Sequence, residues 1–278
     1  MPVDVLAEIL SNTRLAPDYN VVTFRAPQIA EVAEPGQFVM VRCAQGLDPL
    51  LRRPFSIFEH VRDSDGRVTG LSILNKRVGV GTSLLYDVKP GDRLAVLGPL
   101  GRPFVPVSPP DEAWMVAGGV GLAPFATLAE ALAERGTEAT LFYGGRAARD
   151  IYYEEFFTRL GTRLVVTTED GSRGTRGRVT GPLEHALSAR SGKTANLTIY
   201  ACGPTPMMRA VAAVGAAAGC RVLVSLEPVM GCGMGGCYSC VVPVKEGPSG
   251  RHFVRSCTEG PVFDAHALVW DALASTGH

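Results

Sequence analysis

The chain has 278 residues, with 27 Lys and Arg against 27 Asp and Glu, so its formal net charge is zero. Without a basic excess to attract phosphate backbones or anionic lipid, this balance argues against nucleic-acid binding and membrane-surface binding. Apolar residues make up 46% and charged residues 19%, which argues against a disordered chain, and the length suits about two domains.

The N-terminal residues show no basic region followed by an apolar run, so we expect no secretory signal and a cytoplasmic protein. The first third, residues 1–103, contains short β-rich runs separated by turn signals such as Glu34-Pro35-Gly36. Many short strands at this spacing predict an antiparallel β-barrel. Strands are expected at 19–24, 37–42, 55–59, 68–74 and 93–97, and a helix near 82–88.

Two short motifs in this region suit a flavin. In the run RRPFSI, Arg53 could pair with a diphosphate, Pro54 fixes a turn, and Ser56 could hydrogen-bond an isoalloxazine edge. In VGVGTSLL, Gly81 and Thr82 stand at an expected helix start, where backbone N–H groups form an anion site. The alternative is a strand-end Arg-Pro and a Thr N-cap without a ligand. On a barrel, the two motifs together predict a flavin site.

Residues 104–226 alternate between strand-like and helix-like runs, which predicts a doubly wound parallel sheet. The uncharged stretch 113–129 contains three glycines and a proline in its middle, so we interpret it as a buried strand, a turn and a helix, not as a membrane span. Strands are expected at 114–117, 140–143, 164–168, 196–201 and 222–226, and helices at 124–135, 152–160, 182–189 and 205–218.

Two turns of this region follow buried strands, where ligands bind in open α/β sheets. The first is AGGVGLAP at 117–124, and the second is YACGPTPMM at 200–208. Their glycines would let a pyrophosphate or nicotinamide approach the backbone, although the first could simply be a tight turn. Cys202 could face a nicotinamide or be a small buried residue. The candidate nucleotide-binding residues are Gly118, Gly119, Gly121, Pro124, Cys202, Gly203 and Pro204.

Arg146 and Arg149 follow the second strand of this region and could receive a 2′-phosphate, or they could be structural, so NAD and NADP stay unseparated. The five histidines show no ligand spacing and no triad, and no serine lies in a nucleophile elbow, so no catalytic residue is assigned.

The last segment, 227–278, is rich in cysteine and glycine. Four of its cysteines follow the pattern C-x4-C-x2-C-x16-C, which is typical of a plant-type [2Fe–2S] cluster. Neighbouring glycines would let the backbone wrap closely around the sulfurs. Structural zinc is the main alternative, but zinc ribbons favour two CxxC knuckles, and this segment has one. The predicted ligands are Cys232, Cys237, Cys240 and Cys257.

The order of flavin barrel, nucleotide sheet and cysteine module resembles the ferredoxin–NADP reductase superfamily, and with its cluster module it resembles the electron-transfer subunits of dihydroorotate dehydrogenase B. RRPFSI, VGVGT, GGVGLAP, ACGPTPMM and MGCGMGGCYSC…CTEGPVF carry the resemblance over essentially the whole chain. It implies a subunit with FAD, one [2Fe–2S] cluster and NAD. By motif, FAD would be bound by Arg53, Pro54, Phe55, Ser56, Leu74, Asn75, Lys76, Gly81 and Thr82.

One departure stands in this set: members of the family often have an aromatic residue and an Arg where this chain has Asn75 and Lys76. Lys76 keeps the charge but not the bidentate fork, so FAD could be held differently.

The resemblance also implies a partner, an FMN-containing catalytic dihydroorotate dehydrogenase subunit, two of each chain forming a heterotetramer in pyrimidine biosynthesis. This chain shows no site for dihydroorotate oxidation. FAD would convert between the single electrons of the cluster and the hydride taken by NAD. We expect the cluster near the partner interface, with Met230, Met234 and Tyr238 as exposed apolar contacts.

Three other functions stay open. The first is the FAD/[2Fe–2S] subunit of an NADH-dependent ferredoxin:NADP oxidoreductase, a branch whose members often replace one cluster cysteine with Asp. The second is a single-chain reductase that serves an oxygenase. The third is a zinc-ribbon interaction protein on a degenerate reductase scaffold, which would be colourless.

Overall fold

The structure is a computed structural model that describes residues 1–44, 46, 48–190, 194–246, 250 and 252–274. Its N-terminal part is a closed antiparallel barrel in which the strands follow the order β1-β2-β5-β4-β3-β6. Alternate residues of these strands, such as Val22, Phe24, Ile57 and Ile73, point inward and are fully buried. The strands are β1 (Val3–Ala16), β2 (Tyr19–Arg25), β3 (Phe38–Val41), β4 (Arg53–Arg62), β5 (Val68–Lys76) and β6 (Arg93–Leu100).

The expected barrel is confirmed, with one strand more than the sequence indicated. The added strand β1 closes the barrel, because it pairs with β2 on one side and with β6 on the other. Two helices complete this part: the short α1 (Pro27–Ala30) and α2 (Val80–Asp87). Helix α2 begins two residues before the expected start and lies against β5 and β2.

The second part is a seven-stranded sheet in the order β10-β9-β8-β7-β11-β12-β15. Its strands are β7 (Glu112–Gly118), β8 (Ala139–Gly145), β9 (Arg163–Thr168), β10 (Thr175–Arg176), β11 (Leu197–Cys202), β12 (Arg221–Ser225) and β15 (Val262–Asp264). All neighbours in this sheet are parallel except β15, which runs antiparallel to β12.

Helices cover both faces of this sheet, as the doubly wound prediction requires. Apolar side chains of α3 and α4 form one buried core with Met115 and Leu141, and those of α5 and α6 form another with Val116 and Phe142. Strand residues alternate between the two cores, because successive side chains point to opposite faces. The helices are α3 (Phe125–Glu134), α4 (Glu154–Arg159), α5 (Thr180–Ala189) and α6 (Thr205–Ala217).

The C-terminal segment has short strands and helices between and after its cysteines. It forms β13 (Val241–Pro243), β14 (Phe253–Arg255), α7 (Ser256–Glu259) and α8 (Trp270–Ala274), and β13 pairs with β14. Strand β15 of the same segment extends the sheet, and Val242, Val254 and Leu268 are buried in the core under α5 and α6. The cysteine segment is thus continuous with the second part of the molecule.

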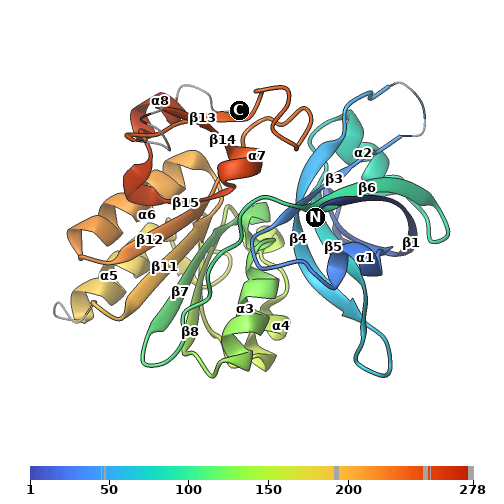
Figure 1. Ribbon diagram of the computed structural model, residues 1–278. Helices are drawn as coiled ribbons and strands as arrows, with labels where there is room; N and C mark the ends of the chain where they lie inside the picture. Colours follow the sequence, from blue (N-terminus) through green and yellow to red (C-terminus); the bar gives the residue numbers. More distant parts are fainter. Residues whose placement is uncertain (45, 47, 191–193, 247–249, 251, 275–278) are drawn as a thin grey trace.

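Figure 1 shows the barrel and the sheet side by side, with the orange to red C-terminal segment at one end of the sheet and extending toward the barrel. Within the part of the chain that the structure describes, no helix has the length and apolar character needed to cross a bilayer.

Candidate functional site

A cavity of about 210 Å³ lies where the barrel, the sheet and the C-terminal segment meet. From the barrel, β4 and β5 line it with five of the predicted flavin residues. From the sheet, the turn after β7 contributes Val120 and Ala123, and the chain after β12 contributes Glu227 and Met230. The predicted flavin residues in its wall are Pro54, Phe55, Ser56, Leu74 and Lys76.

Arg53 lies beside the N-terminus of α2, close to Gly81. Its Nη1 donates to the carbonyl of Leu51 at 2.8 Å, which holds the guanidinium near the start of β4. A Cβ on Gly81 would lie 3.3 Å from Cγ of Arg53, so glycine at this position lets the arginine pass closely over the helix. A guanidinium beside a helix N-terminus is suited to a pyrophosphate.

Thr82 is the third residue of α2 and not its N-cap. Its hydroxyl accepts hydrogen bonds from the backbone N–H groups of Val78 and Gly79, at 2.9 and 3.0 Å, and donates to the carbonyl of Gly79. These bonds satisfy N–H groups that would otherwise be orphaned at the helix start. Thr82 therefore shapes the turn that precedes α2.

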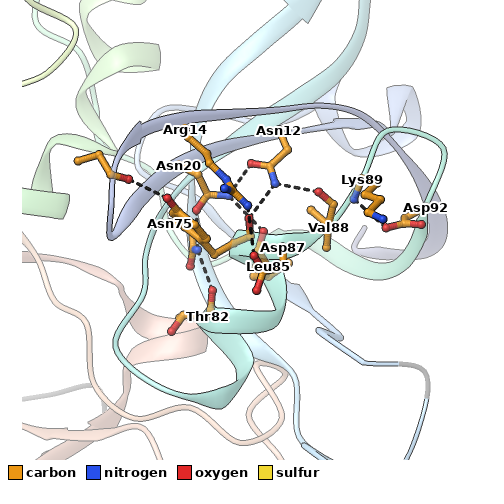
Figure 2. A network of polar contacts seen from close by, with 12 residues as sticks. Asn12, Arg14, Asn20, Asn75, Thr82, Leu85, Asp87, Val88, Lys89 and Asp92 are labelled. Atoms are coloured by element: carbon orange, nitrogen blue, oxygen red, sulfur yellow. Dashed lines mark hydrogen bonds and ion pairs between the residues drawn. The ribbon is translucent and has the colours of Figure 1, made fainter.

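Asn75 lies inside the barrel and is not part of the cavity wall, although the sequence placed it among the flavin residues. Its amide donates to Asn20 Oδ1 at 2.8 Å and to the carbonyl of Thr82 at 3.0 Å. Asn20 in turn donates to the carbonyl of Leu85 at 3.1 Å. Figure 2 shows this network, which extends through Asn12 to the end of α2. Asn75 thus holds the helix, whereas its neighbours Leu74 and Lys76 face the cavity.

Lys76 brings a positive charge to the cavity wall. Its Nζ lies 4.9 Å from the ring centroid of Tyr19, and the Tyr19 ring packs against Tyr152, which lies between β8 and α4, at 5.0 Å between centroids. A cation over an aromatic face is favourable, so this stack fixes Lys76 at the junction of barrel and sheet.

The two glycine-rich turns pack against each other at the carboxyl ends of β7 and β11. The strands are parallel neighbours, with Ala117 opposite Cys202. A Cβ on Gly121 would collide with the carbonyl of Cys202, and one on Gly203 would lie 3.0 Å from the backbone nitrogen of Gly118. Gly203 also has a φ of +148°, which favours glycine. These glycines are therefore required by contact between the turns.

The remaining nucleotide candidates lie in the same place. A Cβ on Gly118 would lie 2.9 Å from Cδ of Pro204, Gly119 has a φ of +56°, and Pro124 stands directly before α3. Of the two arginines after β8, Arg146 places its Nε 3.5 Å from Oδ2 of the buried Asp150. This ion pair with Asp150 gives Arg146 a structural role, which is one of the two alternatives that the sequence left open.

Cys202 is fully buried and does not line the cavity. Its Sγ lies 3.9 Å from Oε1 of Glu227, a residue that sequence analysis did not single out. Burial is the main cause that raises the pKa of Cys202, and the Glu227 charge raises it further. Glu227 itself is exposed and lines the cavity. Its position two residues beyond the end of β12, beside the end of β11, could have indicated it.

The four predicted cluster cysteines lie in one region in two pairs. Backbone N–H groups of Met234, Gly236 and Cys237 point at Sγ of Cys232, at 3.3 to 3.4 Å, and the N–H of Cys232 points at Sγ of Cys237. Hydrogen bonds from Ser239 are the main cause that lowers the pKa of Cys237 to about 6. N–H groups directed at sulfur stabilise thiolates and are found around iron–sulfur clusters.

The second pair is buried. Cys240 and Cys257 contact each other. Burial is the main cause that raises the pKa of Cys257 to about 12, and the contact with Cys240 is the second cause. Among the described residues, no three His, Cys, Asp or Glu side chains meet the geometry for a single metal ion. The donor set of four thiols, with backbone N–H groups directed at two of them, fits a [2Fe–2S] cluster.

The cysteine loop, by which we mean the described residues from Cys232 to Cys257, packs on the barrel. Cys240, Cys257 and Met230 form a buried cluster with side chains of β3 and β6, namely Phe38, Met40, Leu97 and Leu100. Met230 is only 6% exposed, so its expected place on the surface was wrong; it packs beneath the loop. Met234 and Tyr238 are each 62% exposed beside the loop.

Comparisons with known proteins match each part of this arrangement. Residues 115–213 match the oxidoreductase NAD-binding domain, and residues 227–269 match the iron–sulfur cluster binding domain of dihydroorotate dehydrogenase B. The electron transfer subunit of dihydroorotate dehydrogenase B (NAD(+)) of Desulforamulus reducens is 40% identical over 95% of this chain and 98% of its own length. The subunit of that name from Geobacillus kaustophilus is 40% identical over 89% of this chain and 91% of its own.

Solved structures give the same result for the fold. An NADH-dependent reduced ferredoxin-NADP oxidoreductase is similar with a TM-score of 0.81 and 31% identity, over 98% of this chain and 92% of that one. A ferredoxin reductase of carbazole 1,9a-dioxygenase, at 24% identity and a TM-score of 0.65, covers 78% of this chain and 65% of its own, and shares the fold.

Proposed function

The chain belongs to the family of electron transfer subunits of dihydroorotate dehydrogenase B, and from this premise we infer that it passes electrons from a dihydroorotate-oxidising partner to NAD⁺. It is an oxidoreductase subunit that uses FAD, a [2Fe–2S] cluster and NAD. FAD, when bound, exchanges single electrons with an iron–sulfur cluster and an electron pair with NAD.

One observation carries this proposal: three segments far apart in the sequence line a single cavity. Barrel residues such as Ser56 face the turn after β7 across it, and Met230 joins its wall to the cysteine loop. A flavin in this cavity would lie between the nucleotide turns and the cluster ligands, as an exchange between them requires.

The residues of this chain take distinct roles in the proposal. Arg53 and the N-terminus of α2 bind the FAD phosphates, and the cavity residues of β4 and β5 hold the ring. The turns at Gly118–Pro124 and Cys202–Pro204 bind NAD, and the Cys202 thiol donates to Glu227 at the cavity edge. The cluster is held by Cys232, Cys237, Cys240 and Cys257.

We further propose that the partner carries FMN, that two copies of each chain assemble, and that the complex serves pyrimidine synthesis. The name shared by the relatives, which are electron transfer subunits, supports a separate catalytic subunit. Four thiol ligands need a reducing compartment, which supports the cytoplasm.

The test is NADH formation on addition of dihydroorotate to the tagged protein, isolated anaerobically from its own cells together with its partners. Reduction of NAD⁺, and its loss on replacing Cys237 with Ser, is the expected result. A complex that keeps FAD and iron and oxidises NADH with an artificial acceptor, but gives no NADH from dihydroorotate, would contradict the proposed donor.

The second candidate is a subunit of an NADH-dependent ferredoxin:NADP oxidoreductase, favoured by the TM-score of 0.81 to such a structure. Reduction of NADP⁺ by NADH together with reduced ferredoxin, with no oxidation of dihydroorotate by the same preparation, would support it.

A further inference from the structure

Two side chains belong both to the cavity and to the buried side of the cysteine loop. Phe38 of β3 and Met230 line the cavity, and both pack with Cys240 and Cys257. They are 3% and 6% exposed, so each fills the space between the two sites. The cavity and the cysteine loop thus share a wall.

The cysteine loop is also joined to the cavity at both of its ends. Met230 precedes Cys232 by two positions, and Pro261, which also lines the cavity, follows Cys257 by four. The carbonyl of Pro261 accepts from the N–H of Leu226 at 2.9 Å, and the carbonyl of Gly260 accepts from the N–H of Arg102 at 2.5 Å. These bonds fix the end of the loop to the sheet and to the barrel.

On the barrel side of the shared wall, the Phe38 ring is closely packed and has little space to move. A Cβ on Gly101 would lie 2.8 Å from Cε1 of Phe38, so the ring already occupies the space that a side chain at Gly101 would need. In β3, Phe38 is paired with Ser56 and Leu100. Because protein interiors are close-packed, a displacement of the Phe38 ring from the cavity side also displaces its neighbours on the side of the cysteine loop.

We propose that Phe38 and Met230 couple the two cofactor sites, so that FAD in the cavity holds the cysteine loop in its cluster-binding shape and the cluster holds the cavity. This rests on the assignment of FAD and the cluster to these sites in the proposed function. Binding free energies are linked reciprocally. Each cofactor therefore tightens the other by the same factor, about tenfold on the scale of typical couplings.

The test measures both directions on the full-length protein. The dissociation constant of FAD is measured by the quenching of flavin fluorescence, in protein with its cluster and in protein stripped by a chelator. The rate of cluster loss to the chelator is then followed by visible absorbance, with saturating FAD and without it. We expect FAD to bind about tenfold more tightly with the cluster present, and the cluster to be lost more slowly with FAD present.

Variants locate the coupling. Phe38→Ala and Met230→Ala should each bring the two FAD dissociation constants close together, and Phe38→Leu, which keeps an apolar wall, should restore part of their ratio. Met40→Ala is the matched control, because Met40 is buried in the same cluster and lies against Gly233 of the loop but does not line the cavity. It should speed cluster loss equally with and without FAD.

Equal FAD dissociation constants in loaded and stripped wild-type protein, or a rate of cluster loss that FAD does not change, would overturn the coupling. An unchanged ratio in both Phe38→Ala and Met230→Ala would overturn the role of these side chains. A wild-type protein that binds neither FAD nor iron would instead contradict the proposed function, so the two failures are distinguishable.

Discussion

At the scale of single residues, His60 of β4 and Glu130 of α3 meet where the barrel packs against the sheet, with Nδ1 and Oε2 4.0 Å apart. Burial is the main cause that raises the pKa of Glu130 to about 7, and it is also the main cause that lowers the pKa of His60. Both pKa shifts favour the uncharged form of the side chain. The other charged groups that act on the pair are Arg62, Glu59 and Glu134.

Glu130→Gln should change the pH dependence of folding stability. With its pKa raised from 4.5, folded Glu130 keeps a proton that the unfolded chain releases. Its contribution is therefore fully present below pH 4.5 and is lost as the pH rises to about 7. Glutamine cannot ionise, so the variant should gain about 2 kcal/mol relative to wild type between pH 5 and pH 8.

Urea unfolding midpoints across this pH range would measure the effect. The exposed Glu138→Gln is the matched control and should show a constant difference from wild type. A constant difference for Glu130→Gln as well would contradict the assignment of this pH dependence to Glu130.

At the scale of elements, helix α2 depends on a residue outside itself. The Asn75 amide bonds both Asn20 and the carbonyl of Thr82, and it is fully buried. We expect Asn75→Ala to cost about 1–3 kcal/mol, because it leaves the buried Oδ1 of Asn20 and the partly buried carbonyl of Thr82 without this donor. It should also weaken FAD binding by displacing the start of α2, although Asn75 does not line the cavity.

Flavin fluorescence titration and thermal unfolding would measure the two effects of Asn75→Ala. Lys89→Ala is the control, since Lys89 joins the network through its backbone N–H, which alanine retains. FAD affinity equal to that of wild type in Asn75→Ala would mean that the network does not position α2.

Local patterns predicted most elements of the barrel and of the sheet, because short apolar runs and turn residues indicate each strand by itself. They missed β1, whose sequence VDVLAEILSNTRLA has only two buried positions, Ala7 and Ile9, among exposed and half-buried ones, so that its alternation is weak. The approach of Gly121 to Cys202 depends on β7 and β11 being neighbours, and the approach of Glu227 to Cys202 depends on β11 and β12. Such pairings are set by the tertiary fold, which the motifs alone do not specify.

At the scale of the whole molecule, three large apolar side chains are exposed beside the cysteine loop. Met234, Tyr238 and Phe253 are each 62% exposed. Because the proposed partner must bring its own cofactor close to the cluster, we expect this surface to contact it. Met234→Asp should weaken subunit association about tenfold or more, as charges are unfavourable at the core of an interface.

Association of the two subunits can be measured by analytical ultracentrifugation or biolayer interferometry. Val32→Asp replaces an apolar residue of similar exposure, 58%, on the barrel, and it should leave association unchanged. Association of Met234→Asp as tight as that of wild type would place the interface elsewhere.

The short strand β15 has a further consequence for the behaviour of the chain in solution. A sheet edge with unpaired N–H and C=O groups is a template for pairing with another molecule. Here β15 covers the edge of β12, whose Val222 and Val224 are fully buried, and the opposite edge strand, β10, has only two residues and includes Arg176. The segment that holds the cluster ligands thus also protects the sheet against aggregation. Removing this segment would remove the cluster ligands. It would also expose the apolar edge strand β12, which favours aggregation.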